Sequence, residues 1–196
     1  MYHEGQFKEL QLPDNQVFED ITPRLVDVDG DDTPELICIR TDVNLGGGVA
    51  IYRLTETGME EYAFVREIGT VFRWLNIAAV YDLDQDGNID LAWVETPHIG
   101  GVLKVGRIRE GEIMVDAEHP FVTNHAIGER NLCGSALDET RQLIMSSQSR
   151  TKVVYVTYEN GELTRVLEVQ QVLDLTQPIY DQLPNTVFLS DNNCRF

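Results

Sequence analysis

The sequence has little of several features on which proteins commonly depend. It has three cysteines, Cys38, Cys133 and Cys194, an odd number that does not make a disulfide framework, although Cys133 and Cys194 could pair. No Cys/His spacing of a zinc site occurs. Cys38 lies in the apolar run 36–39 and is expected to be a small buried hydrophobe. No apolar run approaches the ~20 residues of a membrane span, so membrane insertion is not expected. Residues 1–14 contain no signal-peptide stretch.

Positive charge is also scarce. The chain carries 15 Lys+Arg against 33 Asp+Glu, which gives a formal net charge of -18. A polyanion would be repelled, so nucleic acid and anionic membranes are not expected partners.

Recognisable catalytic motifs are missing as well. There is no nucleophile elbow, phosphate-binding loop, HExxH or dinucleotide fingerprint. His98 and His125 could line the end of a channel, where ligands commonly bind, or could be ordinary structural histidines. Arg73 and Trp74 could receive a sugar or an acidic peptide, although packing of Trp74 between repeat units is the favoured explanation of that residue. Carboxylate pairs for glycoside hydrolysis can be drawn in too many ways to identify one.

What the sequence does contain is two closely spaced sets of carboxylates, in residues 27–35 and 82–90. Carboxylates this close repel one another, and a hard cation with oxygen ligands would offset the repulsion. We therefore predict two Ca²⁺ sites, with a solvated acidic turn as the alternative. The predicted ligands are four side chains and one backbone carbonyl in each loop: Asp27, Asp29, Asp31, Glu35 and the carbonyl of Thr33; and Asp82, Asp84, Asp86, Asp90 and the carbonyl of Asn88.

The two loops differ at the sixth position. Gly87 permits a tight turn with positive φ, whereas Asp32 adopts that conformation at some cost, so the first site is expected to be weaker. An EF-hand is excluded, because Cys38 and Trp93 replace its bidentate glutamate and the flanking segments have the pattern of strands.

The loops belong to a repeat of 55 residues, the separation of Asp27 and Asp82. In the first two units, the strand after the acidic loop is expected to start at Glu35 and at Asp90, and a Gly-rich turn is expected at 46–48. A third unit follows, in which only Asp138 and Glu139 remain of the acidic loop and Asn160-Gly161 predicts a hairpin turn. Short strands separated by Gly, Asn, Asp and Pro turns predict an all-β, propeller-like fold in one domain, with about four blades. The expected units are residues 20–70, 71–128 and 129–172, with a fourth from 1–19 and 173–196. Strands at 4–13 and 186–190 would contribute to that fourth unit.

The loops, the apolar residue after position nine (Leu36, Leu91) and the repeat length resemble the FG-GAP or VCBS repeats of integrin α-chain-like β-propellers. Segments 21–25, 72–75 and 123–129 are also similar to small bacterial VCBS-repeat proteins without an assigned activity, which are often exported. The resemblance implies Ca²⁺ on the ligands named above. The Phe-Gly and Gly-Ala-Pro signatures that name the repeat are reduced here to Ile-Gly steps, and the third loop has lost its ligands.

These observations favour a non-catalytic, calcium-binding module for a protein or glycan. A carbohydrate-acting hydrolase or lyase with a site on the propeller rim is the first alternative. A structural subunit of a larger assembly is the second, so the chain is expected as a monomer or as such a subunit. Acidic loops of this kind suit calcium-rich extracellular or periplasmic settings.

Overall fold

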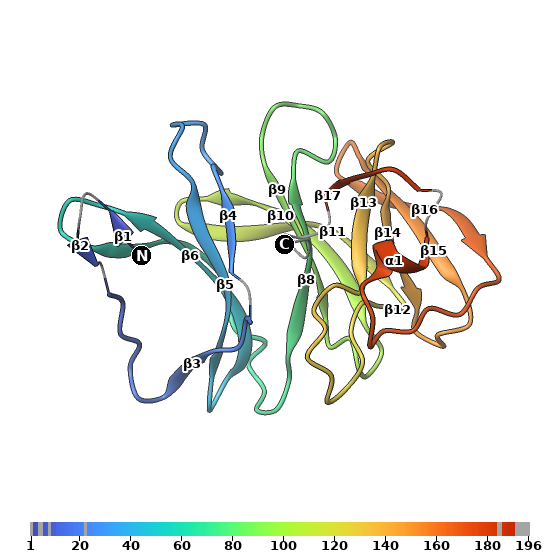
Figure 1. Ribbon diagram of the computed structural model, residues 1–196, viewed down its shortest axis with the longest axis horizontal. Coiled ribbons are helices and arrows are strands. Elements are labelled where there is room, and N and C mark those ends of the chain that lie inside the picture. The colour runs from blue at the N-terminus through green and yellow to red at the C-terminus, as the bar shows by residue number, and fades with distance from the viewer. Residues whose placement is uncertain (1, 4–5, 8, 22, 184–185, 191–196) are drawn as a thin grey trace.

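A computed structural model describes residues 2–3, 6–7, 9–21, 23–183 and 186–190. It is an all-β protein whose strands form three antiparallel units side by side along the longest axis (Figure 1). Besides the strands there is one short helix, α1 (Ile179–Gln182), in the described part of the chain. The predicted fold class is therefore confirmed as all-β.

The first unit orders its strands β3-β5-β6-β7, with β4 also pairing β5. The strands are β3 (Gln16–Phe18), β4 (Arg24–Val26), β5 (Glu35–Asp42), β6 (Gly46–Leu54) and β7 (Met59–Val65).

The second unit orders its strands β8-β9-β10-β11. It joins the first through one parallel pairing, Glu112 with Phe64. The strands are β8 (Leu75–Tyr81), β9 (Asp90–Glu95), β10 (Val102–Arg109) and β11 (Glu112–Pro120).

The third unit orders its strands β16-β15-β14-β13-β17, with β12 also pairing β14. The predicted hairpin turn is present, because Asn160 and Gly161 both have positive φ, 52° and 77°. The strands are β12 (Val122–Thr123), β13 (Ser135–Asp138), β14 (Leu143–Ser147), β15 (Val153–Glu159), β16 (Glu162–Val169) and β17 (Phe188–Ser190).

The two ends of the chain do not behave as expected. β3 pairs with β5 of the first unit, and β17 pairs with β13 of the third. Of the strand expected at 4–13, the described residues contain only β2 (Gln6–Phe7), which pairs antiparallel with β1 (Tyr2–His3). The described residues therefore form no fourth unit across the termini, because each end extends the sheet beside it. Cys194 lies outside the described residues, so its pairing with Cys133 stays a prediction.

The glycines at 46–48 begin strand β6 and are not themselves the turn that the sequence pattern suggested. Gly46 has φ 85°, and a Cβ there would lie 2.5 Å from the carbonyl oxygen of Thr70 and 2.7 Å from that of Arg73. The glycine thus lets the link 70–74 pack against the start of β6. This close approach fixes the position of Arg73 and Trp74.

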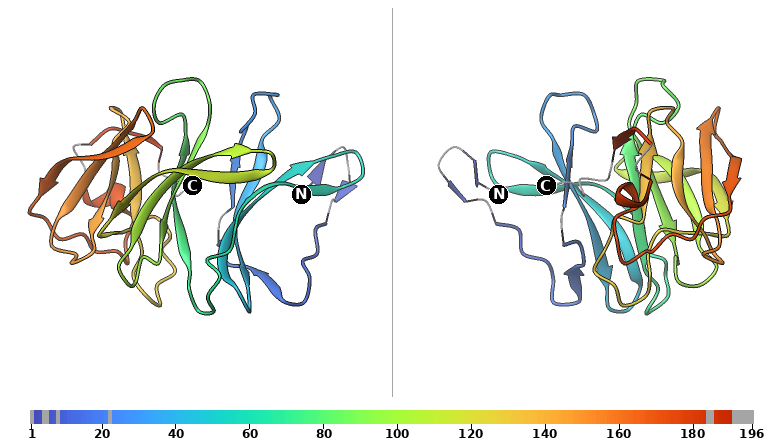
Figure 2. Two further views of the ribbon diagram at one scale, coloured as in Figure 1. Left: turned by 180° about the vertical axis from the view of Figure 1, so that it is seen from behind. Right: turned by 45° about the vertical axis from the view of Figure 1, so that its right-hand side comes forward.

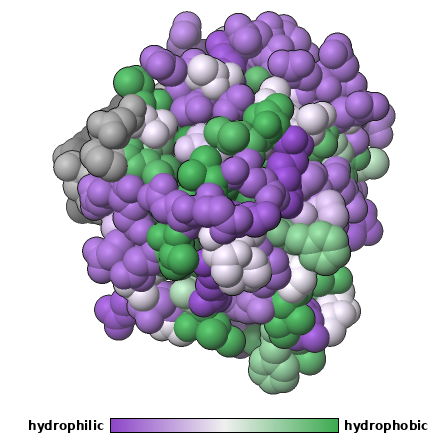
Figure 3. Space-filling model, turned by 90° about the vertical axis from the view of Figure 1, so that its right-hand side faces the viewer, coloured by the Kyte–Doolittle hydropathy of each residue, from purple (hydrophilic) through white to green (hydrophobic). Residues whose placement is uncertain are grey.

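The cores lie between neighbouring units. One apolar cluster joins β5, β6 and β7 to β8 and β9, and includes Ile37, Ile51 and Trp93. A second joins β8, β9 and β10 to the third unit. At the far end, the surface is mainly hydrophilic with separate apolar patches (Figure 3). Strand β16, at this end, exposes Val166, Leu167 and Val169.

Candidate functional site

The two acidic loops lie at one edge of the first two units, where the chain passes from β4 to β5 and from β8 to β9 (Figures 1 and 2). We call this edge the loop edge. β5 begins at Glu35 and β9 begins at Asp90, as the repeat predicted. Three carboxylates in each loop bring oxygens within 4.8 Å of one another: Asp27, Asp29 and Glu35; and Asp82, Asp84 and Asp86.

In the second loop, an arginine from the neighbouring strand contacts the carboxylates. Arg107 on β10 places Nε 2.6 Å from Asp90, Nη1 2.6 Å from Asp86 and Nη2 2.8 Å from Asp84. These are the predicted ligand positions three, five and nine. Hydrogen bonding to Asp90 raises the pKa of Arg107, while burial raises the pKa of Asp90 above its usual range. The guanidinium therefore acts as the cation of this loop.

The first loop repeats the arrangement with an equivalent residue. Arg53 on β6 places Nε 3.2 Å from Glu35, and its Nη2 contacts Asp29. Leu36 pairs with Tyr52 and Leu91 pairs with Gly106, so Arg53 and Arg107 each lie opposite the ninth-position acid. Asp31 is not part of this arginine network, and its Oδ1 instead accepts the N–H of Thr33 at 2.8 Å.

The ninth-position acids also close the loops. Asp90 Oδ2 accepts the backbone N–H of Leu83 at 2.9 Å, and Glu35 Oε2 accepts that of Val28 at 3.0 Å. Both acids are 0 % exposed. Each of these two carboxylates binds the arginine with one oxygen and a backbone N–H with the other. Their main role is therefore to stabilise the loop, and both oxygens already have partners without an ion.

The sixth loop position behaves as the sequence suggested. Asp32 has φ 66° and Gly87 has φ 89°, so both occupy the left-handed region. A Cβ at Gly87 would meet nothing within 4 Å, so the difference between the two residues is one of backbone energy and charge. The predicted carbonyl ligands belong to Thr33 and Asn88, which are both exposed.

The third unit lacks both the ninth-position acid and the arginine opposite it. Leu143 pairs with Val156, so Gln142 and Thr157 occupy the places of the acid and the arginine. Asp138 closes this shorter turn by accepting the N–H groups of Thr140 and Gln142, both at 2.9 Å. The ninth-position acid and the arginine opposite it are therefore both absent from this unit.

The donor set of the first two loops fits a hard divalent ion. Carboxylate and carbonyl oxygens are what Ca²⁺ prefers, and the guanidinium shows where a cation is stabilised. The residues that would hold an ion are those whose carboxylate oxygens already lie close together, chiefly Asp27, Asp29, Asp82, Asp84 and Asp86. An ion would take over part of the charge neutralisation that Arg53 and Arg107 supply.

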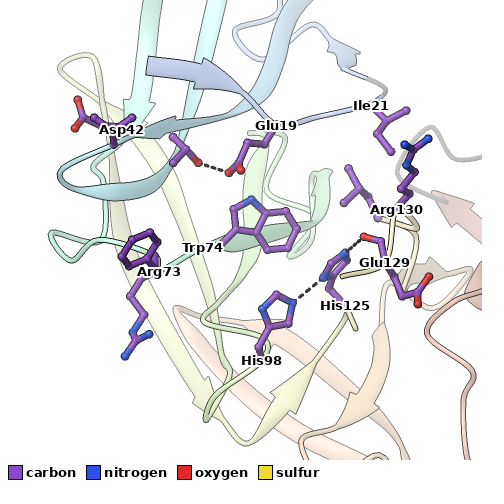
Figure 4. A pocket seen from close by; sticks show the side chains of 13 residues that line it. Glu19, Ile21, Asp42, Arg73, Trp74, His98, His125, Glu129 and Arg130 are labelled. Atoms are coloured by element: carbon purple, nitrogen blue, oxygen red, sulfur yellow. Dashed lines mark hydrogen bonds between the residues drawn. The ribbon is translucent and has the colours of Figure 1, made fainter. Parts of the chain in front are cut away.

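A pocket of about 700 Å³ lies at the opposite edge of the strands, which we call the turn edge (Figure 4). β5 runs from Glu35 in the first loop to Asp42 on the pocket wall, about 23 Å at ~3.3 Å per residue. The link 70–74 contributes Phe72, Arg73 and Trp74. The two regions are thus separated by the length of a strand.

His98 and His125 meet in this pocket although they are 27 residues apart. The link 96–101 is attached to Trp74, whose carbonyl accepts the N–H of Thr96 at 2.9 Å. The link 123–134 is attached to β8, where Asn76 Nδ2 donates to the Asn124 carbonyl at 3.2 Å. These backbone attachments bring the two imidazoles together.

The hydrogen bonds of the pair fix its tautomers. His125 Nε2 lies 3.0 Å from the Glu129 carbonyl oxygen, which can only accept, so Nε2 carries the proton. His125 Nδ1 then accepts from His98 Nε2 at 2.8 Å, which leaves His98 Nδ1 as a hydrogen-bond acceptor. Burial, His98 and the charge of Arg150 lower the pKa of His125 to about 4. Burial and Arg150 also lower the pKa of His98. Both rings are therefore neutral at pH 7.

Aromatic contacts complete the pocket wall. Trp74 is stacked with His98 at 5.8 Å between ring centroids and lies 4.6 Å from His125 at a tilt of 57°. The sequence suggested these residues individually, but gave no sign that they form one group. It also missed Arg53 and Arg107, for which the available signal was their equal place in the two repeats.

No family model matches the chain, and no curated protein matches it. Among solved structures, the rhamnogalacturonan lyase YesW is similar at a TM-score of 0.48 and 17% identity, over 79% of this chain and 34% of that one. The exotype rhamnogalacturonan lyase YesX has a TM-score of 0.47 and 16% identity, over 78% and 33%. The chain spans about a third of the length of these enzymes. A resemblance this remote assigns no activity to the chain.

Proposed function

We propose that the chain is a calcium-binding repeat β-domain that serves as a module for binding a protein or a glycan. The observation that supports it best is the duplicated loop: two units carry the same acidic cluster, the same buried ninth-position acid and the same arginine. The loops stabilise the start of β5 and β9, and the pocket at the turn edge is left for a ligand. In this proposal the ions have a structural role.

The proposal includes a propeller-like arrangement of FG-GAP or VCBS type. Three antiparallel units in a row, with loops 55 residues apart, support it. An extracellular or periplasmic location is part of the same proposal, since such loops suit compartments rich in calcium.

Calcium binding is tested by thermal unfolding of the full chain in Ca²⁺ and in EGTA. An ion at 100 times its Kd stabilises a site by about 2.7 kcal/mol, and a domain of this size gains roughly 2–4 °C per kcal/mol. We expect Ca²⁺ to raise the Tm by about 5–10 °C and to slow proteolysis. Unchanged Tm and unchanged protease resistance would reject the calcium role.

A second candidate function is a carbohydrate-acting hydrolase or lyase. The observation that favours it is the His98–His125 pair, which places a neutral imidazole acceptor in a pocket that Arg73 also lines. Incubation with acidic and neutral polysaccharides, followed by assays for new reducing ends and for unsaturated products, tests it. Activity that His98→Gln abolishes would replace the non-catalytic proposal.

A third candidate, a subunit of an assembly, is favoured by the exposed apolar residues of the outer strand β16. Measurement of the mass in solution separates it from the first, because a monomer at all concentrations argues against assembly.

A further inference from the structure

The arginines of this protein divide into two groups. At the loop edge and along the strands, they have carboxylate partners: Arg24, Arg40, Arg53, Arg66, Arg107, Arg109, Arg141 and Arg165. Within the described part of the chain, Arg73, Arg130 and Arg150 have no such ion pair. In a chain with net charge -18, carboxylates are abundant, so arginines without one are the exception.

These three arginines lie in one region. Arg73 and Arg130 line the pocket, on either side of the histidine pair in Figure 4. Arg150 is close enough that its charge lowers the pKa of both His98 and His125. Guanidinium groups bind carboxylates through paired, charge-assisted hydrogen bonds. The turn edge therefore offers donors for a negatively charged group that the chain itself does not supply.

The pocket also presents aromatic surface to the solvent. Phe72 is 95 % exposed and has φ 59°, an uncommon backbone conformation for a bulky residue. Trp74 is half-buried beside it, with His98 stacked on the indole. A bulky residue held at positive φ is strained, and such strain is concentrated where ligands bind. Aromatic rings of this kind accept the apolar faces of sugar rings.

The remaining polar groups suit hydroxyls better than a chain of carboxylates. His98 and His125 are neutral and supply both a donor and an acceptor. Glu19, Asp42 and Glu129 also line the pocket, so with Arg73 and Arg130 its formal charge is -1. A peptide with several acidic residues would be repelled by these carboxylates. A ligand with one carboxylate and several hydroxyls could pair its carboxylate with an arginine and its hydroxyls with the neutral histidines.

We propose that the turn-edge pocket binds a carboxylate-bearing saccharide. Arg73 and Arg130 would hold the carboxylate, while Trp74, Phe72 and the histidine pair contact the sugar ring and its hydroxyls. This inference rests on the proposed function as a binding module and names the class of its ligand.

The experiment is calorimetric titration of the full chain in Ca²⁺ with three probes: a short oligomer of neutral sugars that carries one galacturonate residue, the same oligomer with that carboxyl reduced to an alcohol, and hexaglutamate. We expect the galacturonate oligomer to bind at least tenfold more tightly than the other two, since a charge-assisted hydrogen bond contributes about 1.5–3 kcal/mol. Equal affinity for the reduced oligomer would overturn the role of the carboxylate. Tighter binding of hexaglutamate would replace the saccharide with an acidic peptide, and no binding of any probe would reject the proposal.

Two variants locate the site. Arg73→Gln and Arg130→Gln should each weaken galacturonate binding about tenfold, with an unchanged Tm. Arg66→Gln is the matched control, because Arg66 is an exposed arginine that pairs with Glu112, outside the pocket lining. Equal losses in all three variants would mean that only net charge matters, and the proposed site would be wrong.

The Tm in Ca²⁺ and EGTA is recorded on the same samples. A calcium shift without saccharide binding rejects this inference alone. Saccharide binding without a calcium shift rejects the calcium role and leaves the pocket assignment standing.

Discussion

At the loop edge of the second unit, Arg107 contacts three carboxylates, whereas Arg73 at the turn edge of the same unit forms no ion pair with any described residue. At the loop edge the arginines are paired with carboxylates, and the loops are already closed by backbone hydrogen bonds. The turn edge has arginines without an ion pair to a described residue, neutral histidines and an exposed phenylalanine. Arginines that are already paired fit a structural role, and arginines without an ion pair fit a binding role.

The largest expected effect comes from removing the arginine that pairs with three carboxylates of the second loop. Arg107→Gln leaves Asp90 buried without its cation, so in EGTA the free energy of unfolding should fall by about 2–4 kcal/mol. Ca²⁺ should restore most of the loss, because an ion neutralises the same carboxylates. Urea unfolding with and without Ca²⁺ measures both.

Arg109→Gln is the control for Arg107→Gln. Arg109 is on the same strand, but its pair with Asp116 is at the surface, so its loss should cost less than about 1 kcal/mol. Equal costs for the two variants would contradict the structural role assigned to Arg107 at the loop edge.

At the turn edge, the corresponding test is the dependence of the free energy of unfolding on pH. His125 has a pKa of about 4 in the folded protein and 6.5 as the ordinary value. The unfolded chain therefore binds a proton first as the pH falls, and stability decreases from pH 6.5 towards pH 4. The decrease should be about 2–3 kcal/mol for this residue, which is 5 % exposed. The pH profile of unfolding, compared with that of His125→Gln, isolates this contribution from those of the carboxylates.

NMR titration of the His125 ring gives the pKa directly. A midpoint near 6.5 would show that the ring is solvated, and the contrast between the two edges would lose its strongest support at the turn edge.

The two repeated loops can be distinguished from the third turn by substitution. Asp86→Ala should remove about 1–2 kcal/mol of the stabilisation by Ca²⁺, because the second of the two predicted calcium sites loses a ligand. Asp138→Ala, the control in the third unit, should lower stability without changing the calcium response. A calcium response that Asp86→Ala leaves intact would place the ion elsewhere.

The smallest effect concerns the sixth loop position. Asp32→Gly should raise stability by about 0.5–1 kcal/mol, since glycine adopts φ 66° without strain. Asp32→Asn removes the charge but keeps a side chain in the same conformation, so it separates charge from backbone energy. If Asn and Gly stabilise equally, repulsion in the first loop is the cause.

Much of the fold could be predicted from the sequence because its signals are local. The spacing of Asp82, Gly87 and Asp90 fixes a turn, and the apolar segment after Asp90 fixes a strand, so the starts of β5 and β9 were found correctly. The hairpin at Asn160-Gly161 depends on two adjacent residues and was also found. Such features need no knowledge of what lies across the sheet.

The rest depends on contacts between distant segments. Arg107 reaches Asp90 only because β10 pairs with β9 in one register, and His98 meets His125 only because two links are attached to β8 and Trp74. The ends of the chain were assigned to a common unit by elimination, without a pairing signal. Their actual partners, β5 and β13, follow from edges that the sequence does not reveal.

The positions of the two tryptophans give the molecule a pair of independent optical reporters. Trp93 is enclosed in the core between the first two units, three residues after Asp90 on the same strand, and Trp74 contacts the histidines of the pocket. Emission from Trp93 should follow the integrity of the sheets, and emission from Trp74 should change when a ligand binds in the pocket. The single variant Trp74→Phe separates the two signals, so events at the two edges can be timed in one fluorescence experiment without an added label.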